Sequence, residues 1–141
     1  MLKAYKYRIC PNKTQQISLA KTFGCVRYFW NKQVEMFNSY NKEINPKPIY
    51  KTSTVVRNEL VWMKEVSAAA IQQKEIDFKS YKQQKFSKNR KNNIGFPSFK
   101  KKSNRQSYRL PNQKFILKNN KIKLEKIGLV KIITEIGRAH V

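Results

Sequence analysis

The hydrophobic positions recur with two different periods, one on each side of the stretch GFPSFKKK at 95–102. Before this stretch they recur at steps of three and four residues, as on the buried face of a helix. After it they alternate, as in a strand. Gly95 frees the backbone, whereas Pro97 fixes φ and lacks an N–H donor, so the stretch should interrupt both patterns. The change of period predicts an α+β fold.

Three helices are predicted before this stretch. The first begins near Asn12 or Thr14, since either side chain can cap it, and it ends before the prolines that follow residue 45. Its hydrophobic stripe consists of Leu19, Phe23, Val26, Trp30, Val34 and Phe37. A short second helix is predicted at about 54–63. Ser67 can cap a third helix at about 68–85, whose stripe is Ile71, Lys74, Phe78 and Tyr81.

A first strand is predicted at 2–9, where polar and apolar residues alternate and Lys6 and Arg8 share one face. Pro11 ends this pattern. One strand alone has no sheet to complete, so the first strand should join the strands that follow the helices.

The later strands are predicted at 106–110, at 129–134 and in a β-hairpin between them. The alternating residues of the hairpin are Phe115, Leu117, Ile122 and Leu124. Asn119 and Asn120 lie at its centre, and asparagine tolerates the left-handed backbone that a tight hairpin turn requires.

The expected organisation is a small β-barrel-like lobe with a helical lobe inserted into it. The β-lobe would combine the first strand at 1–12 with the later strands at 95–134, and the helices would occupy 13–94. The last residues, 135–141, continue neither pattern, so we expect a non-native or disordered tail there.

Composition adds a strong positive charge to this picture. The chain has 31 Lys and Arg residues against 8 Asp and Glu, a formal net charge of +23. No acid lies between Asp77 and Glu125. The bases in this acid-free segment are Lys79, Lys82, Lys85, Lys88, Arg90, Lys91, Lys100, Lys101, Lys102, Arg105, Arg109, Lys114, Lys118, Lys121 and Lys123. Such a segment favours a nucleic-acid partner. An anionic membrane fits less well, because the aromatic residues do not form one face of a long basic helix.

Groups for catalysis or metal binding are scarce. Asp77 is the only aspartate and His140 the only histidine, so neither clustered carboxylates nor a Ser/His/Asp set is in place. Cys10 and Cys25 are too few for a disulfide framework or a zinc site. No apolar run is long enough to span a membrane, and no secretory signal begins the chain. We therefore expect a cytoplasmic protein that holds no cofactor, binds no membrane and has no small-molecule substrate.

Five segments, in this order and spacing, resemble the N-terminal part of TnpB, the OrfB-type family of insertion-sequence proteins that are often labelled transposases. The segments are YKYRICPNKTQQ, KTFGCVRYFWN, WMKEVSAAAIQQKEIDFKSY, GFPSFKKKSNRQSYRLP and LKNNKIKLEKIGLVKI. The resemblance covers about 2–134. It implies a β-barrel wedge lobe with an inserted helical recognition lobe, catalogued in part as a helix-turn-helix domain. It also implies an RNA-guided DNA endonuclease, similar to type V CRISPR effectors, whose partners are guide RNA and target DNA.

In the family, the catalytic carboxylates and their Mg²⁺ belong to a C-terminal RuvC-like domain, which a Cys-rich zinc module follows. This chain ends before both, so no catalytic residue is carried over, and we expect this fragment not to be an enzyme. The family pattern does raise Arg27 and Asn31 in the first helix, and the turn residues around Pro97.

The candidate nucleic-acid-binding residues come from the charge pattern and from this resemblance. They are Lys6, Arg8, Arg27, Tyr28, Asn31, Lys79, Lys82, Lys85, Phe96, Phe99, Lys100, Lys101, Lys102, Arg105, Ser107 and Arg109. Lysines can neutralise phosphates, and flat rings can stack on bases.

Structural alternatives stay open for several of these predictions. Arg27 and Asn31 could belong to a solvated helix surface, and GFPSFKKK could be a solvated loop that its phenylalanines anchor to a core. Cys25 is more typical of a buried structural thiol than of a reactive one. Trp30, Phe37 and Phe78 are expected in the core. The alternative function is a stand-alone basic RNA-binding module of the ribosomal-protein type.

Overall fold

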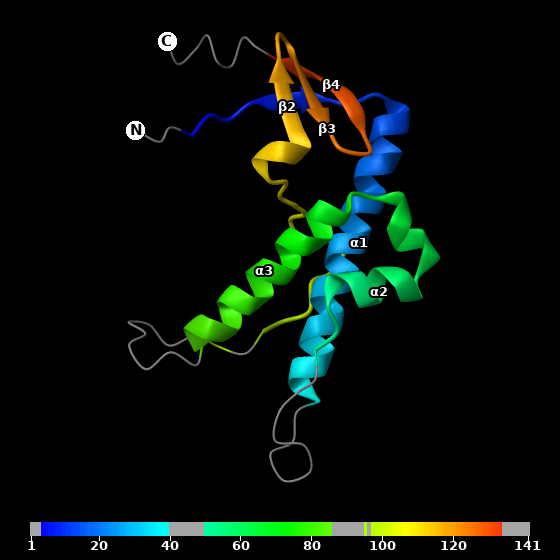
Figure 1. Ribbon diagram of the computed structural model, residues 1–141. Coiled ribbons are helices and arrows are strands. Elements are labelled where there is room, and N and C mark those ends of the chain that lie inside the picture. The colour runs from blue at the N-terminus through cyan, green and yellow to red at the C-terminus, as the bar shows by residue number, and fades with distance from the viewer. Residues whose placement is uncertain (1–3, 40–49, 86–94, 96, 134–141) are drawn as a thin grey trace.

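The computed structural model describes residues 4–39, 50–85, 95 and 97–133 (Figure 1). These residues form a group of helices and a four-stranded sheet. The elements are β1 (Arg8–Cys10), α1 (Lys13–Asn38), α2 (Ser53–Glu59), the 3₁₀ helix η1 (Val61–Glu65), α3 (Ala68–Lys85), the 3₁₀ helix η2 (Asn112–Lys114), β2 (Phe115–Lys118), β3 (Lys121–Leu124) and β4 (Gly128–Ile133). The predicted α+β class is confirmed. The assignment of these segments to two lobes remains a prediction, and the tail at 135–141 lies outside the described residues.

The sheet gathers strands from both ends of the chain. It is antiparallel, with the order β1-β4-β3-β2, so the first strand does join the later ones. Strand β1 is shorter than the predicted 2–9, however. Arg8 lies opposite Ile133, the last residue of β4, and residues 4–7 have no partner strand in the described part of the chain. The described strands form an open sheet, with β1 and β2 at its edges.

The predicted hairpin is confirmed. Lys118 lies opposite Lys121, so that only two residues connect β2 to β3, and Asn119 has a φ of 53°. Asparagine adopts this left-handed conformation more readily than most residues, and two-residue hairpin turns require it.

The strand predicted at 106–110 is wrong. This segment has no regular secondary structure, and it lies against α1 instead of pairing with a strand. The Gln106 side chain accepts a hydrogen bond from Arg27, and the Tyr108 ring packs edge-on against Phe23 with centroids 5.6 Å apart. Contacts with helix side chains therefore take the place of a β-ladder.

Helix α1 begins with a capping box. The Asn12 side chain accepts from the Gln15 N–H at 2.9 Å, and the Gln15 side chain accepts from the Asn12 N–H at 2.9 Å. Asn12, rather than Thr14, is therefore the N-cap. This reciprocal arrangement satisfies two backbone donors that the first turn leaves free.

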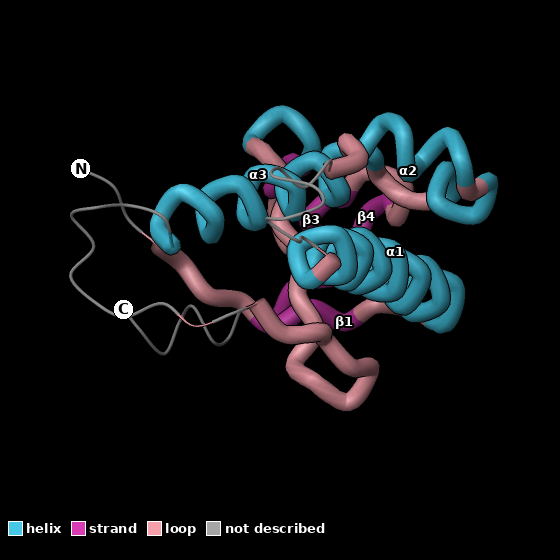
Figure 2. The backbone as a smooth tube through the Cα atoms, turned by 90° about the horizontal axis from the view of Figure 1, so that it is seen from below, coloured by secondary structure: helices cyan, strands magenta, loops and turns pink. Residues whose placement is uncertain are grey.

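The sheet lies at the N-terminal end of helix α1, and helix α3 packs along α1 (Figure 1 and Figure 2). Of the predicted stripe, Leu19, Val26 and Val34 are buried. A second buried face belongs to the core between α1, α2, η1 and α3. That core contains Cys25, Phe29, Val56, Met63, Val66 and Ile71.

Helix α3 packs along α1 and carries an aromatic cluster at their contact. Phe78 is buried, and the rings of Trp30, Phe37, Tyr50 and Tyr81 surround it at centroid distances of 5.1 to 6.3 Å. Phe78 is thus a core residue as expected, and the half-buried Trp30 and Phe37 pack on it. The helix begins directly after Ser67, whose hydroxyl donates to Glu125 at 2.6 Å and so links α3 to the β3–β4 turn.

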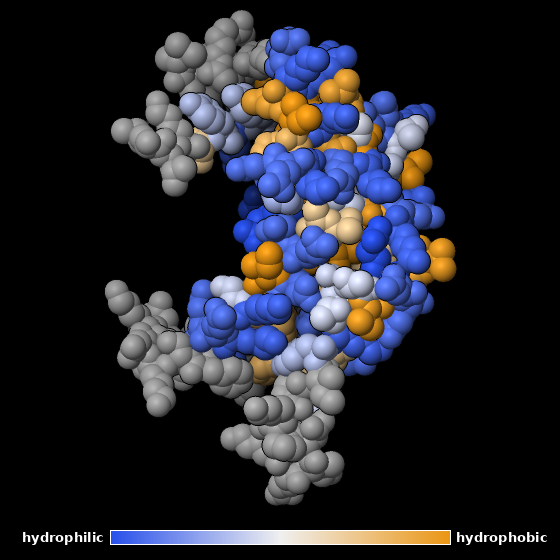
Figure 3. All heavy atoms as spheres, viewed as in Figure 1, coloured by the Kyte–Doolittle hydropathy of each residue, from blue (hydrophilic) through white to orange (hydrophobic). Residues whose placement is uncertain are grey.

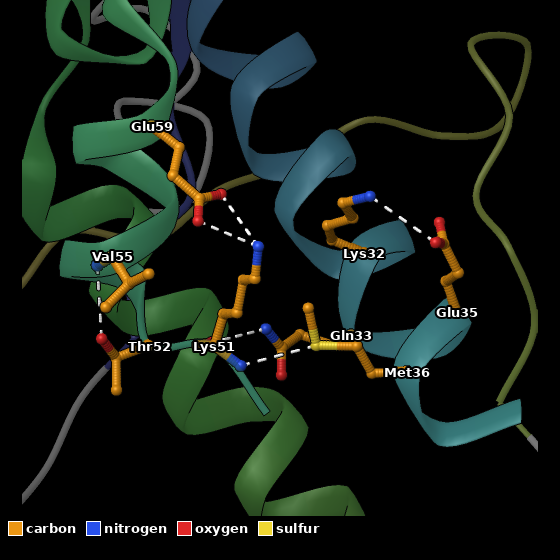
Figure 4. Close-up of polar contacts among 8 residues, drawn as sticks. All are labelled: Lys32, Gln33, Glu35, Met36, Lys51, Thr52, Val55 and Glu59. Carbon is orange, nitrogen blue, oxygen red and sulfur yellow. Dashed lines mark hydrogen bonds and ion pairs between the residues drawn. The ribbon is translucent and has the colours of Figure 1, made fainter. Parts of the chain in front are cut away.

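The second helix of the prediction is two helices in the structure, α2 and η1, joined at Leu60. Polar contacts tie the start of α2 to the C-terminal half of α1 (Figure 4). Gln33 donates to the Lys51 carbonyl at 2.9 Å, and Thr52 caps α2 by accepting from the Val55 N–H. The Lys51 ammonium pairs with Glu59 at 2.9 Å.

Hydrophilic residues cover most of the face seen in Figure 3, and hydrophobic ones appear as separate spots. Within the described residues, no helix is long and apolar enough to cross a membrane.

Candidate nucleic-acid interface

The segment that follows Pro97 is held against α1 by side chains of the helix. The Asn31 amide donates from Nδ2 to the Lys100 carbonyl at 2.9 Å and accepts from the Lys100 N–H at 2.7 Å. The preceding residue, Trp30, donates from Nε1 to the Ser98 carbonyl at 3.0 Å. The backbone at Lys100 is therefore fixed as if by a neighbouring strand, and the lysine side chains that follow project from a held loop.

This loop and α1 enclose a small hollow that is ringed by cations. We name it the cationic hollow. It is lined by Phe23, Val26, Arg27, Lys74, Lys100, Lys101, Asn104, Arg105, Gln106 and Ser107, and its volume is about 30 Å³. Five of these residues carry a positive charge, and no carboxylate is among them. The predicted residues Arg27, Lys100, Lys101, Arg105 and Ser107 thus come together at one place.

Two of the cations are oriented by their surroundings. Arg27 donates from Nη1 to Oε1 of Gln106 at 3.2 Å, and the Lys100 ammonium lies 5.2 Å from the centre of the Trp30 ring. Backbone and side-chain donors that converge with cations are the groups that bind phosphate oxygens. The hollow is therefore chemically suited to a phosphate group.

Lys74 belongs to the hollow, although the sequence did not single it out. Its position in the hydrophobic stripe of the third helix suggested a core residue, and its side chain is largely buried. The ammonium lies 5.6 Å from the centre of the Trp30 ring and 3.5 Å from Asp77. A charged residue inside an apolar stripe was the signal that could have identified it.

A larger depression, which we name the aromatic cleft, shares Arg27 with the hollow. Its volume is about 580 Å³, and its lining residues are Lys21, Gly24, Cys25, Arg27, Tyr28, Asn31, Lys32, Glu35, Trp62, Glu65 and Phe99. The Tyr28 and Trp62 rings meet edge-to-face with centroids 5.1 Å apart. Rings exposed in such a cleft can stack on a nucleic-acid base.

Phe99 is a wall of the aromatic cleft and not a core anchor. Its side chain is 52% exposed. A ring this exposed cannot anchor the loop through burial, because a phenylalanine stabilises a fold strongly only where its ring is buried. The idea that the phenylalanines of the turn anchor the loop to a core therefore does not hold for Phe99, whereas Phe96 lies outside the described residues.

The three predicted lysines of α3 lie away from the cationic hollow. Lys79 is exposed. The Lys82 ammonium lies 3.6 Å from the centre of the Tyr50 ring. Burial against these rings, together with the nearby Lys79 charge, lowers the pKa of Lys82. Lys85 lies in the last turn of the helix.

The remaining predicted residues are scattered. Arg109 forms an ion pair with Asp77, so its charge is compensated within the protein. Lys102 is exposed, and it follows the part of the loop that Trp30 and Asn31 hold. Lys6 precedes β1 and Arg8 begins it, far along the chain from the hollow.

Cys25 is a buried thiol, as expected, and Cys10 is exposed. Burial, and to a lesser extent the Glu65 carboxylate, raises the pKa of Cys25 to about 11. Cys25 is therefore a poor nucleophile. The described residues contain no group of three or more His, Cys, Asp or Glu side chains that could hold a metal ion.

Asn31 gives a direct test of how the loop is held. We expect Asn31→Ala to lower the free energy of unfolding by about 1–3 kcal/mol, because it removes two hydrogen bonds to the Lys100 backbone. Asn31→Asp should be at least as damaging, since it places a carboxylate oxygen against the Lys100 carbonyl. Urea denaturation measures both, and Asn38→Ala, an exposed change at the end of the same helix, is the matched control. Equal stabilities of the Asn31 and Asn38 variants would show that the two hydrogen bonds between Asn31 and the Lys100 backbone contribute nothing to the free energy of unfolding.

Comparison with known proteins gives two findings. Residues 1–44 match a family of helix-turn-helix domains from OrfB proteins of the IS605 type. A Streptomyces pristinaespiralis protein that carries the provisional name RNA-guided DNA endonuclease is 31% identical over 77 residues, and the match covers 50% of this chain and 19% of that protein. The match thus spans less than a fifth of the curated relative. Both findings confirm the predicted similarity to the N-terminal part of TnpB (OrfB-type) proteins.

The part of the helix-turn-helix match that the structure describes, 4–39, consists of β1 and the uninterrupted helix α1. One half of helix α1 is buried, and Arg27, Trp30 and Asn31 hold the segment after Pro97 against the adjoining face, so α1 is not free to lie in a DNA groove as a recognition helix does. The candidate interface is therefore the surface beside α1, where the cationic hollow and the aromatic cleft lie.

Proposed function

We propose that this TnpB-like chain binds the phosphate backbone of a nucleic acid at the cationic hollow, as the N-terminal part of an RNA-guided DNA endonuclease. Its partner would be the guide RNA, the target DNA or the duplex that they form. The observation that carries the proposal is the convergence of five cations around a hollow that no carboxylate lines and whose loop is held in place by Asn31. Four of these cations form no ion pair among the described residues, whereas Lys74 is paired with Asp77.

The chemistry of the hollow favours backbone recognition over reading of sequence. Lysine and arginine side chains that contact phosphates position a nucleic acid without distinguishing its bases. In RNA-guided systems, base pairing reads the sequence, whereas the protein grips the backbone and a short flanking motif. The neighbouring aromatic cleft would then take an unpaired base, by stacking on Phe99 or Trp62.

We assign no catalytic step to these residues. The matched family domain is not a catalytic one. Cleavage and its Mg²⁺ would be functions of a nuclease domain like the one that the family carries C-terminally, and the described residues would supply binding alone.

The test compares two double variants that remove the same charge. Lys101→Gln with Arg105→Gln removes two cations of the hollow, while Arg27 and Lys100, which contact Gln106 and Trp30, stay in place. Lys13→Gln with Lys64→Gln removes two exposed lysines that lie elsewhere and form no ion pair among the described residues. Fluorescence anisotropy with a labelled RNA hairpin measures binding as a function of salt.

We expect the hollow variant to bind more weakly and to flatten the log–log salt dependence by about 1.4–1.8, which corresponds to two lost phosphate contacts. RNA hairpins of different sequence should be affected alike. The Lys13/Lys64 variant should bind as the wild type does. If the two variants behave identically, the hollow is not the binding site.

A further inference from the structure

The outer face of the sheet carries a second group of cations, which the strand register brings together. Arg8 begins β1 opposite Ile133 of β4. In the middle of the sheet, Lys131 of β4 lies opposite Lys121 of β3, and Lys121 lies opposite Lys118 of β2. Residues that face one another across an antiparallel pair point to the same side, as do residues two apart along a strand. The five bases of the strands, Arg8, Lys118, Lys121, Lys123 and Lys131, therefore share one face, which we name the basic sheet face.

The opposite side of the sheet is the one that faces the protein. Val130 and Ile132 of β4 are buried, and they alternate with the exposed Leu129 and Lys131. All five bases of the basic sheet face are exposed. The face is thus open in the described part of the chain.

The three lysines in the middle of the face form a row of like charges. Lys118, Lys121 and Lys131 lie on three adjacent strands, whose spacing is about 5 Å. Like charges directly opposite one another destabilise a sheet. The four strands contain no acid that would compensate them. The ion pairs among the described residues use other cations, namely Lys21, Lys32, Lys51, Lys74, Arg109 and Lys114.

Apolar side chains lie beside this row. Lys123 is flanked by Ile116 on β2 and Leu129 on β4, which are 54% and 51% exposed. Exposed aliphatic side chains between lysines offer a contact surface for the sugars of a nucleic-acid strand, whose phosphates the lysines neutralise. A small anion would meet only one or two of these cations, whereas a linear polyanion can follow the whole row.

We propose that the basic sheet face is a second binding site for the phosphate backbone of a nucleic acid, distinct from the cationic hollow. The proposal rests on the proposed function, because both sites would hold parts of the same partner. The row of Lys118, Lys121 and Lys131 would contact consecutive phosphates, with Arg8 and Lys123 at its sides. Cys10 lies directly opposite Lys131, so its thiol reports on whether the face is covered.

The first test is a charge variant in the row. Lys121→Gln with Lys131→Gln should flatten the log–log salt dependence of RNA-hairpin binding by about 1.4–1.8, whereas Lys13→Gln with Lys64→Gln should leave it unchanged. Lys121→Arg with Lys131→Arg keeps the charge and should retain the wild-type slope. The melting temperature of the glutamine variant should not fall, because the exchange relieves repulsion between like charges.

The second test is protection of Cys10 in the unmodified protein. N-ethylmaleimide should alkylate the exposed Cys10 and spare the buried Cys25, whose pKa of about 11 keeps it protonated. Peptide mass spectrometry follows alkylation at each thiol as the RNA hairpin is added. Cys10 should lose most of its labelling rate, along the same titration curve as the anisotropy.

The outcomes separate this inference from the proposed function. Tight binding with a fully reactive Cys10 and an unchanged slope in the Lys121/Lys131 variant overturns the basic sheet face and leaves the hollow standing. Absence of binding overturns both. Protection of Cys10 by phosphatidylserine vesicles but not by the RNA hairpin would assign the face to a membrane surface and overturn the proposal.

Discussion

Replacing Phe29 by alanine is expected to lower the free energy of unfolding by about 3–5 kcal/mol. Phe29 lies in α1 and is 0% exposed. It belongs to the core that includes Val56 of α2, Met63 of η1 and Ile71 of α3, so its ring lies where α1, α2, η1 and α3 meet. Removing the ring leaves a cavity at the point where these elements meet.

The size of this loss is large relative to the whole stability of a domain, which is typically about 5–15 kcal/mol. Urea denaturation followed by circular dichroism measures it. Ile17→Ala is the matched control, because Ile17 lies on the same helix and is 59% exposed, so its loss should cost little. If the two variants unfold at the same urea concentration, the helices do not share the core that the structure shows.

Phe29 also illustrates how much of the fold the sequence could predict. The three- and four-residue steps identified one buried stripe of α1 correctly at Leu19, Val26 and Val34. Phe29 was missed because a periodicity argument looks for one stripe, whereas α2 and η1 pack on a second face of the same helix. Burial on two sides depends on where later elements lie, and local pattern does not contain that information.

The strands also show that a local pattern does not contain the tertiary arrangement. The hairpin around Asn119 was predictable, since both the alternation and the turn residues are local. The segment at 106–110 has a strand-like sequence but no strand beside it, and its neighbour is α1. Alternation alone therefore does not establish a strand, because the tertiary arrangement decides whether the segment has a strand to pair with.

The sequence predicted which residues belong to the candidate site, but not how they are arranged in space. Charge and family resemblance selected Arg27, Lys100, Lys101, Arg105 and Ser107, and these residues do line one hollow. The role of Asn31 could not be derived from the sequence, because its amide binds a backbone that lies 69 residues further along the chain. The basic sheet face was also hidden, since its cations come from four strands and meet only through the register.

Raising the salt concentration from about 50 to about 200 mM is expected to weaken binding to an RNA hairpin by about 10³-fold. The reason is that bound phosphates release condensed counterions, and this release is less favourable in high salt. Six phosphate contacts would give a log–log slope of about −4 to −5. The cationic hollow and the basic sheet face together supply enough cations for that number, because the hollow has four besides the paired Lys74 and the sheet face has five.

The salt dependence of the measured affinity must arise from binding and not from a change in folding stability. The ion pairs of the described residues are mostly solvent-exposed, for example Lys21–Glu65 and Lys51–Glu59, and such pairs contribute about 0–1 kcal/mol to stability. Thermal melts at both salt concentrations should therefore nearly coincide. A melting temperature that holds while anisotropy shows the steep slope supports the polyelectrolyte mechanism. A slope near zero would show that the positive charge of the chain is not used to grip phosphates, and it would remove the basis of both proposed sites.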